Sequence, residues 1–421
     1  MRKIIFMLLS GISLACTSNA QWTTVTTGTI STFMACSFGN PSTVYVAGGM
    51  GTDSATIMKS TNAGVSFYHL NASFIPAGQC IFSCWFTSMD TGFVAGGDPS
   101  PAGTTGFIYK TVNGGTSWTS VVSGVVTALR SIQFTSSATG YASGGFNGTG
   151  DIYKTIDHGN TWTPIFSSGT PAVSLYKEYF VNDTTGYVIG DNHTAVRSKC
   201  ITIKSGSVFS NVDLGAYNDF GCVYFSSADT GFVSAQDSGT YHQRMLKTTN
   251  GGTSWTSVYS STAAYNGAVI RFADHSKGFM VGDANLATTD GGNTWSIFAP
   301  IPSPTGSYFD MAISGSVGII VGESGMILRN GGVTGLQIPC ETKPGINVYP
   351  NPFTMQTTIS FDNEQTNTRI IITDVTGKEV RRINCTGTTL TIDRGQMKPG
   401  MYLMTITPAN GITTTAKFAV Q

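Results

Sequence analysis

The chain of 421 residues has few charged side chains and no excess of either sign. Lys and Arg number 23, Asp and Glu number 23, and the four types together make up 11% of the residues. A protein that neutralises nucleic-acid phosphates needs a clustered surplus of Lys and Arg, so the composition argues against a nucleic-acid partner. After residue 20, no apolar run reaches the roughly 18 residues that a membrane-spanning helix needs. We therefore expect no transmembrane segment.

Motifs that hold metals or cofactors are also missing from the sequence. There is no Cys-x-x-Cys pair, no His at ligand spacing from a cysteine, and the five histidines are scattered along the chain. Neither a glycine-rich phosphate loop with Lys nor a Ser-His-Asp order is present. The sequence therefore predicts neither a metal nor a cofactor.

Glycine and hydrophobic residues are abundant instead. The chain contains 51 Gly and 24 Phe, and hydrophobic residues make up 40% of it. Glycine and β-branched threonine disfavour long helices, and glycine permits tight turns, whereas this hydrophobic share is sufficient for a packed core. The composition predicts a folded, all-β protein.

The first 20 residues are typical of a secretory signal peptide. Arg2 and Lys3 precede an apolar stretch over residues 4–15, and Ser18-Asn19-Ala20 is a small-x-small cleavage site. Leu14-Ala15-Cys16 is similar to the end of a lipobox, which leaves lipidation of Cys16 as an alternative. We expect a protein that is secreted, or held on the outer cell surface, after cleavage near Ala20.

Cleavage at that site leaves seven cysteines in a compartment where disulfides can form. Cys80 with Cys84, and Cys200 with Cys222, are plausible local pairs. Isolated buried thiols are an equal alternative, and the odd number leaves at least one cysteine unpaired.

The C-terminal segment, residues 346–421, carries an ordered set of motifs behind a Pro- and Gly-containing linker at 336–345. The motifs are Tyr349-Pro350-Asn351-Pro352-Phe353, the turn Asp374 to Lys378, Gly400-Met401-Tyr402-Leu403 and Lys417-Phe418-Ala419-Val420. Alternating segments predict strands of a small sandwich over 357–361, 369–373, 379–383, 389–392, 401–407 and 413–420. The segment resembles the type A C-terminal sorting domain of the bacterial type IX secretion system. That resemblance implies an Ig-like fold, the type IX machinery as partner, passage through the outer membrane and removal of the domain afterwards.

The middle of the chain is repetitive. A turn motif of the form Lys-Thr-x-Asn-Gly-Gly-x-Ser-Trp recurs, and its closing aromatic residues are spaced 40 to 51 residues apart. They are Trp22, Phe67, Trp118, Trp162, Phe209, Trp255 and Trp295. A second motif, an aromatic residue followed by a turn and a Gly-aromatic-Val strand, runs in register with the first and also occurs seven times. Two motifs therefore give the same number of repeats.

A unit of about 45 residues suits four short strands, which is one blade of a β-propeller. A single such sheet cannot bury both of its faces, and only a closed ring protects the end blades. The last turn motif, Leu328 to Gly332, stops before its aromatic residue, and Trp22 supplies one at the start of the mature chain. We predict a seven-bladed β-propeller over residues 21–335, closed by pairing of its two ends, followed by the small sandwich.

The repeats resemble the Asp-box, or BNR, repeats of sialidases, sortilin-type ectodomains and, most closely, photosystem II assembly/stability factor-like propellers. Gly278 to Gly282 and Thr288 to Trp295 carry that resemblance best. In these turns Asn or Asp is expected to accept backbone N–H bonds, Gly-Gly to adopt positive φ, and the aromatic residue to pack between blades. We assign the turn residues no chemistry.

Loops between the second and third strands of each blade are expected to open on one face, which is a plausible ligand face. The candidate residues on these loops are Asp191, His193, Arg197, Asp237, Tyr241, His242, Arg244, Asp283 and Glu323, with Asp98 and Asp151 as further acids. The favoured function is a non-catalytic module that binds an extracellular glycan, polymer or protein. The alternative is a secreted glycoside hydrolase that uses two loop acids, Asp237 with Asp283 or Asp191 with Glu323.

Overall fold

The computed structural model describes residues 22–49, 54–100, 105–125, 127–145, 150–167, 173–192, 197–205, 207–215, 217–264, 268–282, 284–298, 301–302, 306–333, 346–374, 378–407 and 414–421. The predicted signal peptide, the linker at 336–345, His193, Asp283 and Cys340 lie outside these residues. The chain divides into two compact units, residues 1–336 and 337–421.

Seven four-stranded antiparallel sheets build the first unit, one for each predicted repeat. Blade 1 contains β2 (Phe33–Asn40), β3 (Thr43–Gly48), β4 (Thr56–Ser60) and β5 (Tyr68–Leu70). Blade 2 contains β6 (Cys80–Phe86), β7 (Gly92–Gly97), β8 (Gly106–Thr111) and β9 (Thr119–Val125). Blade 3 contains β10 (Leu129–Phe134), β11 (Gly140–Gly144), β12 (Asp151–Thr155) and β13 (Thr163–Ser167). Blade 4 contains β14 (Val173–Asn182), β15 (Thr185–Asn192), β16 (Arg197–Lys204) and β17 (Ser207–Gly215).

The remaining three blades repeat the plan, and blade 6 has the shortest set of strands. Blade 5 contains β18 (Tyr217–Phe225), β19 (Gly231–Asp237), β20 (His242–Thr248) and β21 (Thr256–Ala264). Blade 6 contains β22 (Val269–Phe272), β23 (Gly278–Val281), β24 (Leu286–Thr288) and β25 (Ser296–Ile297). Blade 7 contains β26 (Tyr308–Ser314), β27 (Val317–Gly322), β28 (Ile327–Asn330) and the N-terminal β1 (Thr23–Thr24). The described residues contain no helix, and therefore no helix that could span a membrane.

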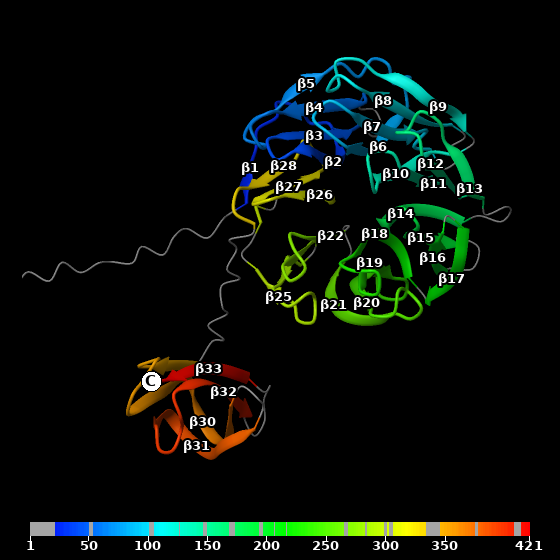
Figure 1. Cartoon of the computed structure of the whole chain (residues 1–421). Helices are drawn as coiled ribbons and strands as arrows, with labels where there is room; N and C mark the ends of the chain where they lie inside the picture. Colours follow the sequence, from blue (N-terminus) through cyan, green and yellow to red (C-terminus); the bar gives the residue numbers. More distant parts are fainter. Residues whose placement is uncertain are drawn as a thin grey trace, which may run out of the picture. The chain divides into compact units, whose positions relative to one another are not determined.

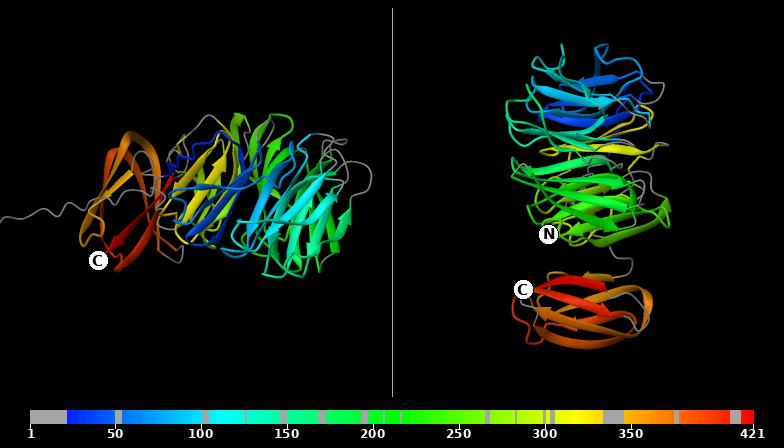
Figure 2. Two further views of the ribbon diagram at one scale, coloured as in Figure 1. Left: turned by 90° about the horizontal axis from the view of Figure 1, so that it is seen from above. Right: turned by 90° about the vertical axis from the view of Figure 1, so that its right-hand side faces the viewer.

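The blades close into a ring. The first strand of each blade contacts the first strand of the next, and β26 contacts β2 (Figure 1). Figure 2 shows neighbouring blades side by side from two further directions. The predicted closure is confirmed, because Thr23 pairs with Arg329 and Thr24 with Leu328. The Trp22 side chain is buried in this blade, and a Cβ at Gly318 would lie 2.8 Å from its ring, so Gly318 leaves the space that Trp22 fills.

Aromatic residues of the two repeat motifs pack together between blades, as predicted. Tyr45 of blade 1 stacks on Phe86 of blade 2 with ring centroids 3.4 Å apart, and Trp118 of blade 2 meets Phe86 edge-on. The same triplet recurs as Phe93, Phe134 and Trp162, as Tyr187, Phe225 and Trp255, and as Phe232, Phe272 and Trp295. Blade 4 departs from this pattern at its turn, where Phe209 lies in β17 and its side chain is outside the described residues.

The turn motifs behave as their residues predict. In blade 2, Asn113 Oδ1 accepts the N–H of Ser117, and Gly114 and Gly115 have φ values of 68° and 87°. In blade 3, Asp157 Oδ1 accepts the N–H groups of Asn160 and Thr161. Glycine adopts such φ values most readily, and the first of the two positions also takes Ala63 in blade 1 and His158 in blade 3, with φ values of 56° and 62°.

The second unit has fewer and longer strands than predicted. Its strands are β29 (Ile346–Tyr349), β30 (Gln356–Asp374), β31 (Glu379–Asp393), β32 (Gly400–Thr407) and β33 (Thr414–Val420). β30 covers two predicted strands, and so does β31. β30 pairs with β29 through its first half and with β32 through its second half, and its pairing with β31 shifts register between Ser360 and Thr368. These register shifts accompany the change of partner along one long strand, from β29 to β32.

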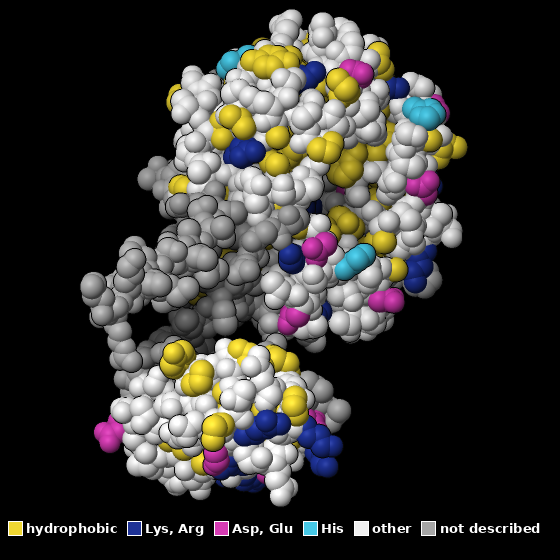
Figure 3. Space-filling view, turned by 60° about the vertical axis from the view of Figure 1, so that its left-hand side comes forward, with side chains coloured by type: hydrophobic (Ala, Val, Ile, Leu, Met, Phe, Trp, Pro, Cys, Tyr) yellow, Lys and Arg dark blue, Asp and Glu magenta, His cyan; other side chains and the backbone are white. Residues whose placement is uncertain are grey.

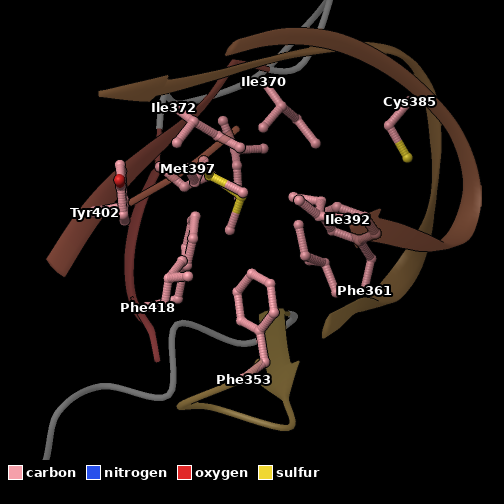
Figure 4. Packing of buried hydrophobic residues seen from close by; sticks show 13 residues of the cluster. Phe353, Phe361, Ile370, Ile372, Cys385, Ile392, Met397, Tyr402 and Phe418 are labelled. Carbon is pink, nitrogen blue, oxygen red and sulfur yellow. The ribbon is translucent and has the colours of Figure 1, made fainter. Parts of the chain in front are cut away.

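Buried hydrophobic residues from all parts of this unit converge on one core. Figure 4 shows Phe353, Phe361, Ile372 and Phe418 among the side chains that point into the common interior. Phe353, the last residue of the Tyr-Pro-Asn-Pro-Phe motif, therefore has a structural role in this core.

Of the two alternatives for the cysteines, isolated buried thiols are found among the described residues, and the local pairs do not form. Cys84, Cys200 and Cys222 are free thiols buried in the propeller, as is Cys36, and Cys385 is buried in the second unit. Cys36, Cys84, Cys200 and Cys385 therefore occupy apolar packing positions, as small hydrophobic residues do.

Candidate functional site

Charged side chains are sparse on the surface, as the composition requires, and Figure 3 shows them scattered over the face in view. The described residues predicted for the loop face lie at or near the junctions between the second and third strands of their blades. Asp237 ends β19, Tyr241 lies in the connection, and His242 begins β20. Antiparallel strands of like-built blades place these junctions at one edge of the ring.

Asp237 and Arg244 form the best-defined pair at this edge. The Arg244 Nη2 lies 3.4 Å from Asp237 Oδ2, and Arg244 also donates to Ser260 Oγ. The Asp237 Oδ1 accepts the N–H groups of Gly239 and Thr240 and the Thr240 hydroxyl. These hydrogen bonds, chiefly the Thr240 N–H, hold the pKa of Asp237 below its usual range, so it remains a carboxylate committed to its turn.

The other described loop residues are separate from this pair. Tyr241 is exposed and has a φ of 58°. Asp98 Oδ1 accepts the N–H of Ser100, an ordinary turn contact. Asp151 is buried at the start of β12, where burial raises its pKa. Glu323 is partly buried and its backbone N–H donates to Ser307 O.

Four of the predicted loop residues carry no described side chain. Asp191 lies in β15 and Arg197 in β16, where the backbone of Asp191 pairs with Ser198 and that of Arg197 with Asn192. His193 and Asp283 lie outside the described residues. The proposed acid pairs of a hydrolase therefore stay predictions.

The innermost strands enclose a cavity that the sequence analysis did not anticipate. It has a volume of about 440 Å³ and is lined by residues of β2, β6, β10, β14, β18, β22 and β26, one strand from each blade. The cavity is therefore the central channel of the ring, and its size lies in the range of small-ligand sites, roughly 300–1,000 Å³.

Equivalent positions on these strands supply the polar lining. Ser83, Ser131, Lys177, Cys222 and Asp310 hold the same place in their blades, because each pairs with the corresponding residue of the second strand. Four different chemical types thus occur at one repeated position. The repeat builds the channel, and the variation at this position determines its chemistry.

An ion pair lies on one side of the channel. The Arg271 Nη2 donates to Asp310 Oδ1 at 2.9 Å, and Asp310 Oδ2 accepts the backbone N–H of Cys36 at 3.1 Å. Arg271 Nη1 donates to the Ile270 carbonyl and contacts Cys222 Sγ. Asp310 thus ties blade 6 to blade 7 and blade 7 to blade 1.

Glu178 is the unusual acid of this region. It lies beside Lys177 on β14, its side chain is buried, and neither carboxylate oxygen has a hydrogen bond of ordinary geometry among the described residues. Burial raises its pKa to about 8, against smaller opposing effects of nearby Ser143 and Lys177. Glu178 is therefore largely protonated at neutral pH.

The sequence did contain a signal for these residues. Lys177, Glu178, Arg271 and Asp310 are charged residues inside otherwise apolar segments, shortly before the turn of the second motif. Aligning the seven inner strands on that motif would have placed them at neighbouring positions of the repeat, although it would not have shown that these positions line a channel. Among the described residues, no group of three or more His, Cys, Asp or Glu could hold a metal ion.

The predicted sorting motif divides into buried and exposed parts. Tyr349 is exposed, the Tyr349-Pro350 and Asn351-Pro352 bonds are cis, and Asn351 Oδ1 accepts the N–H of Ala419. Tyr402 is buried and donates to the carbonyl of Lys398 at 2.8 Å, next to Gly400 at the start of β32. Lys417 lies in β33, and its side chain is outside the described residues.

Solved structures similar to this chain are propellers. YCF48 bound to D1 peptide is 17% identical, with a TM-score of 0.57 over 73% of this chain and 96% of that one. YCF48 from Cyanidioschyzon merolae is 15% identical, with a TM-score of 0.56 over 74% and 98%. PorZ of Porphyromonas gingivalis, described as a bacterial surface component of the type-IX secretion system, is 13% identical, with a TM-score of 0.51 over 94% of this chain and 60% of PorZ. At these identities the likeness establishes the fold alone.

No curated protein sequence matches the chain. One family model does match it, over residues 347–421, and its description is a secretion system C-terminal sorting domain. A domain of this kind implies secretion to the cell surface or the extracellular space. The chain is thus a seven-bladed β-propeller that ends in a C-terminal sorting domain.

Proposed function

We propose that the exported chain is a non-catalytic binding module for an extracellular glycan, polymer or protein. In this proposal, residues 1–20 are the signal peptide, residues 21–335 are the propeller with Asp-box turns, and residues 336–345 join it to the sorting domain. The type IX machinery recognises the C-terminal domain, and the propeller remains to bind its ligand outside the cell.

One observation carries the proposal: the propeller encloses a polar channel whose described acids are unsuited to hydrolysis. Asp310 is held by Arg271 and by the N–H of Cys36, and Glu178 is buried beside apolar residues. On the loop edge, Asp237 is committed to its turn and to Arg244. A retaining or inverting glycosidase needs two carboxyl groups that face each other across the sugar, about 5 to 10 Å apart. Asp310 and Asp237 instead serve the framework, and Glu178 lies buried without a hydrogen-bond partner, which favours binding.

A glycan-array screen of the purified mature protein, run beside a panel of chromogenic glycosides, tests this proposal. We expect retention of at least one class of glycan or surface polymer and no turnover of any glycoside. Turnover that disappears in Asp283→Asn, or in Asp237→Asn, would replace the binding role with hydrolysis. Both variants keep the size of the side chain and remove its negative charge.

A further inference from the structure

The central channel is rich in hydrogen-bond donors that the fold leaves unused. Ser83 Oγ accepts the N–H of Ile132 from the next blade, Ser131 Oγ accepts that of Glu178, and Ser37 Oγ accepts that of Phe86. Each hydroxyl therefore has its acceptor site occupied, while its own proton has no acceptor among the described residues. A hydroxyl can both accept and donate, so three protons remain available to a ligand.

These three serines are framework residues as well as donors. Their exposed fractions are 7% for Ser37, 8% for Ser83 and 6% for Ser131, and all three line the cavity. Because they sit on consecutive blades and are held by backbone N–H groups, their positions are fixed before any ligand arrives. A buried donor without an acceptor is costly, which favours a ligand that supplies one.

Lys177 adds a positive charge to the same side of the channel. It follows the three serines around the ring, in blade 4, and its ammonium group has no hydrogen bond or ion pair among the described residues. The other cation, Arg271, is neutralised by Asp310. Glu178 does not cancel Lys177, because its pKa of about 8 keeps it largely protonated at pH 7. The described lining thus presents one uncompensated positive charge.

Aromatic and amide side chains complete the lining. Trp85, Tyr179 and Tyr224 face the cavity, with the rings of Tyr179 and Tyr224 4.8 Å apart, and Gln133 lies beside them. One positive charge, several hydroxyl donors and aromatic faces suit a sugar that carries a single carboxylate, whereas a phosphate dianion would call for more cations.

We propose that the central channel binds an acidic sugar of the uronic acid class, with its carboxylate at Lys177 and the hydroxyls of Ser83 and Ser131. This inference rests on the proposed binding function and specifies the ligand chemistry and the place of the site. The loop edge around Asp237 is then not required for this contact.

Titration calorimetry of the mature protein with glucuronate, and with glucose as the neutral match, tests the inference. We expect glucuronate to bind and glucose to bind at least roughly tenfold more weakly, since only glucuronate pairs with the ammonium group. Raising the salt concentration should weaken glucuronate binding, because the charge contribution is screened.

Lys177→Met removes the charge and keeps most of the side-chain length. We expect it to weaken glucuronate binding roughly tenfold, and Ser131→Ala to weaken it by a smaller factor. Lys277→Met makes the same change on the turn before β23, outside the cavity lining, and should leave binding unaltered. Circular dichroism of each variant separates lost binding from lost fold.

Three results would overturn the inference: equal affinity for glucose and glucuronate, full affinity in Lys177→Met, or binding of N-acetylalanine without binding of glucuronate. The last result would indicate a peptide carboxylate. A neutral glycan captured on the array, together with no response to glucuronate, would reject the acidic-sugar site and leave the binding function standing. Absence of all binding together with glycoside turnover would reject both.

Discussion

Glu178 occupies a position that is apolar in every other blade. Its register partner is Val188, and the residues that hold the same place in the other six blades are Cys36, Cys84, Ile132, Val223, Ile270 and Met311. An ionised carboxylate at such a position would lose its hydration without gaining a partner. The protonated form avoids that loss, so the fold selects the neutral acid.

Replacing Glu178 by Gln should make stability less dependent on pH. The pKa of Glu178 is about 8 in the folded chain, against 4.5 for the ordinary group, so the folded state holds this proton more tightly. The protonated Glu178 therefore contributes fully to the free energy of unfolding below about pH 4.5, and this contribution is lost as the pH rises to 8. One pKa unit corresponds to about 1.4 kcal/mol. The free energy of unfolding of Glu178→Gln, relative to that of the unmodified chain, should therefore rise by a few kcal/mol over that window.

Chemical unfolding of both proteins at several pH values between 5 and 8 measures this difference. Glu323→Gln, at a partly exposed loop position, is the control and should show no such trend. A constant gap between Glu178→Gln and the unmodified chain across the window would contradict the assigned pKa.

At the scale of the strand and turn, basic residues of the repeat motif connect several blades to the next one. Lys59 Nζ donates to Gly114 O of the next blade, Lys110 to His158 O, Lys247 to Gly292 O, and the Arg329 Nε to Ala63 O. Lys59, Lys110 and Lys247 also stand over an aromatic ring of their own blade. The first residue of the motif is thus a contact between units, and this explains its recurrence.

The Asn of the turn motif should contribute measurably to blade stability. Asn250 Oδ1 accepts the Thr248 hydroxyl and the N–H of Ser254, and its Nδ2 donates to Ser254 Oγ. A net hydrogen bond is worth about 0.5–1.5 kcal/mol, and this turn is exposed, so Asn250→Ala should cost about 1–2 kcal/mol in denaturant unfolding. Thr249→Ala, also exposed in the same turn, should change stability far less. Equal effects of the two substitutions would show that the turn does not depend on the Asn side chain.

At the scale of the whole molecule, closure of the ring depends on a very short strand. β1 is two residues long, and only Trp22 before it and Val25 after it add buried apolar area to the closing blade. Thr27 also donates to Gly325 O, and the N–H of Val25 to Ile327 O. Trp22 is therefore the largest buried side chain that the N-terminal segment adds to a closure that the β26–β2 contact and the Asp310–Cys36 hydrogen bond also support.

Trp22→Ala should destabilise the closed ring more than the substitution of an exposed residue does. Replacing a buried Trp by Ala typically lowers the free energy of unfolding by about 3–5 kcal/mol. Here the substitution removes packing between the two ends of the propeller. We expect a lower midpoint of thermal unfolding and faster proteolysis near the N-terminus. Thr23→Ala, exposed on the same strand, is the matched control. Unchanged unfolding of Trp22→Ala would show that β1 is dispensable for the ring.

Export is the second property of the whole chain, and it should depend on residues 347–421. A chain that lacks these residues should keep a folded propeller, because the two units are separately compact, and should accumulate inside the cell. Immunoblots of cell fractions, with the unmodified chain alongside, measure this. Equal amounts of both chains outside the cell would exclude a sorting role for the segment.

Repetition made the fold predictable. The spacing of Trp118, Trp162, Trp255 and Trp295 and the matching Gly-aromatic strands gave the number of blades, and the missing aromatic after Leu328 gave the closure with Trp22. The ordered C-terminal motifs gave the sorting domain. In the second unit, the predicted strands 357–361 and 369–373 belong to one strand, because its pairing with β31 continues through the polar residues between them by shifts of register, although those residues are typical of a turn.

The candidate site was far less predictable. The sequence predicted a site of loop residues such as Asp237, whose carboxylate accepts hydrogen bonds within a local turn. The channel instead combines Ser83, Ser131, Lys177 and Asp310, which are dozens of residues apart and look like ordinary strand residues in isolation. Local patterns along the chain are enough to set strands, turns and their repetition, because those depend on near neighbours. Which side chains share a channel depends on how the closed ring superposes equivalent positions, and only the folded molecule decides that.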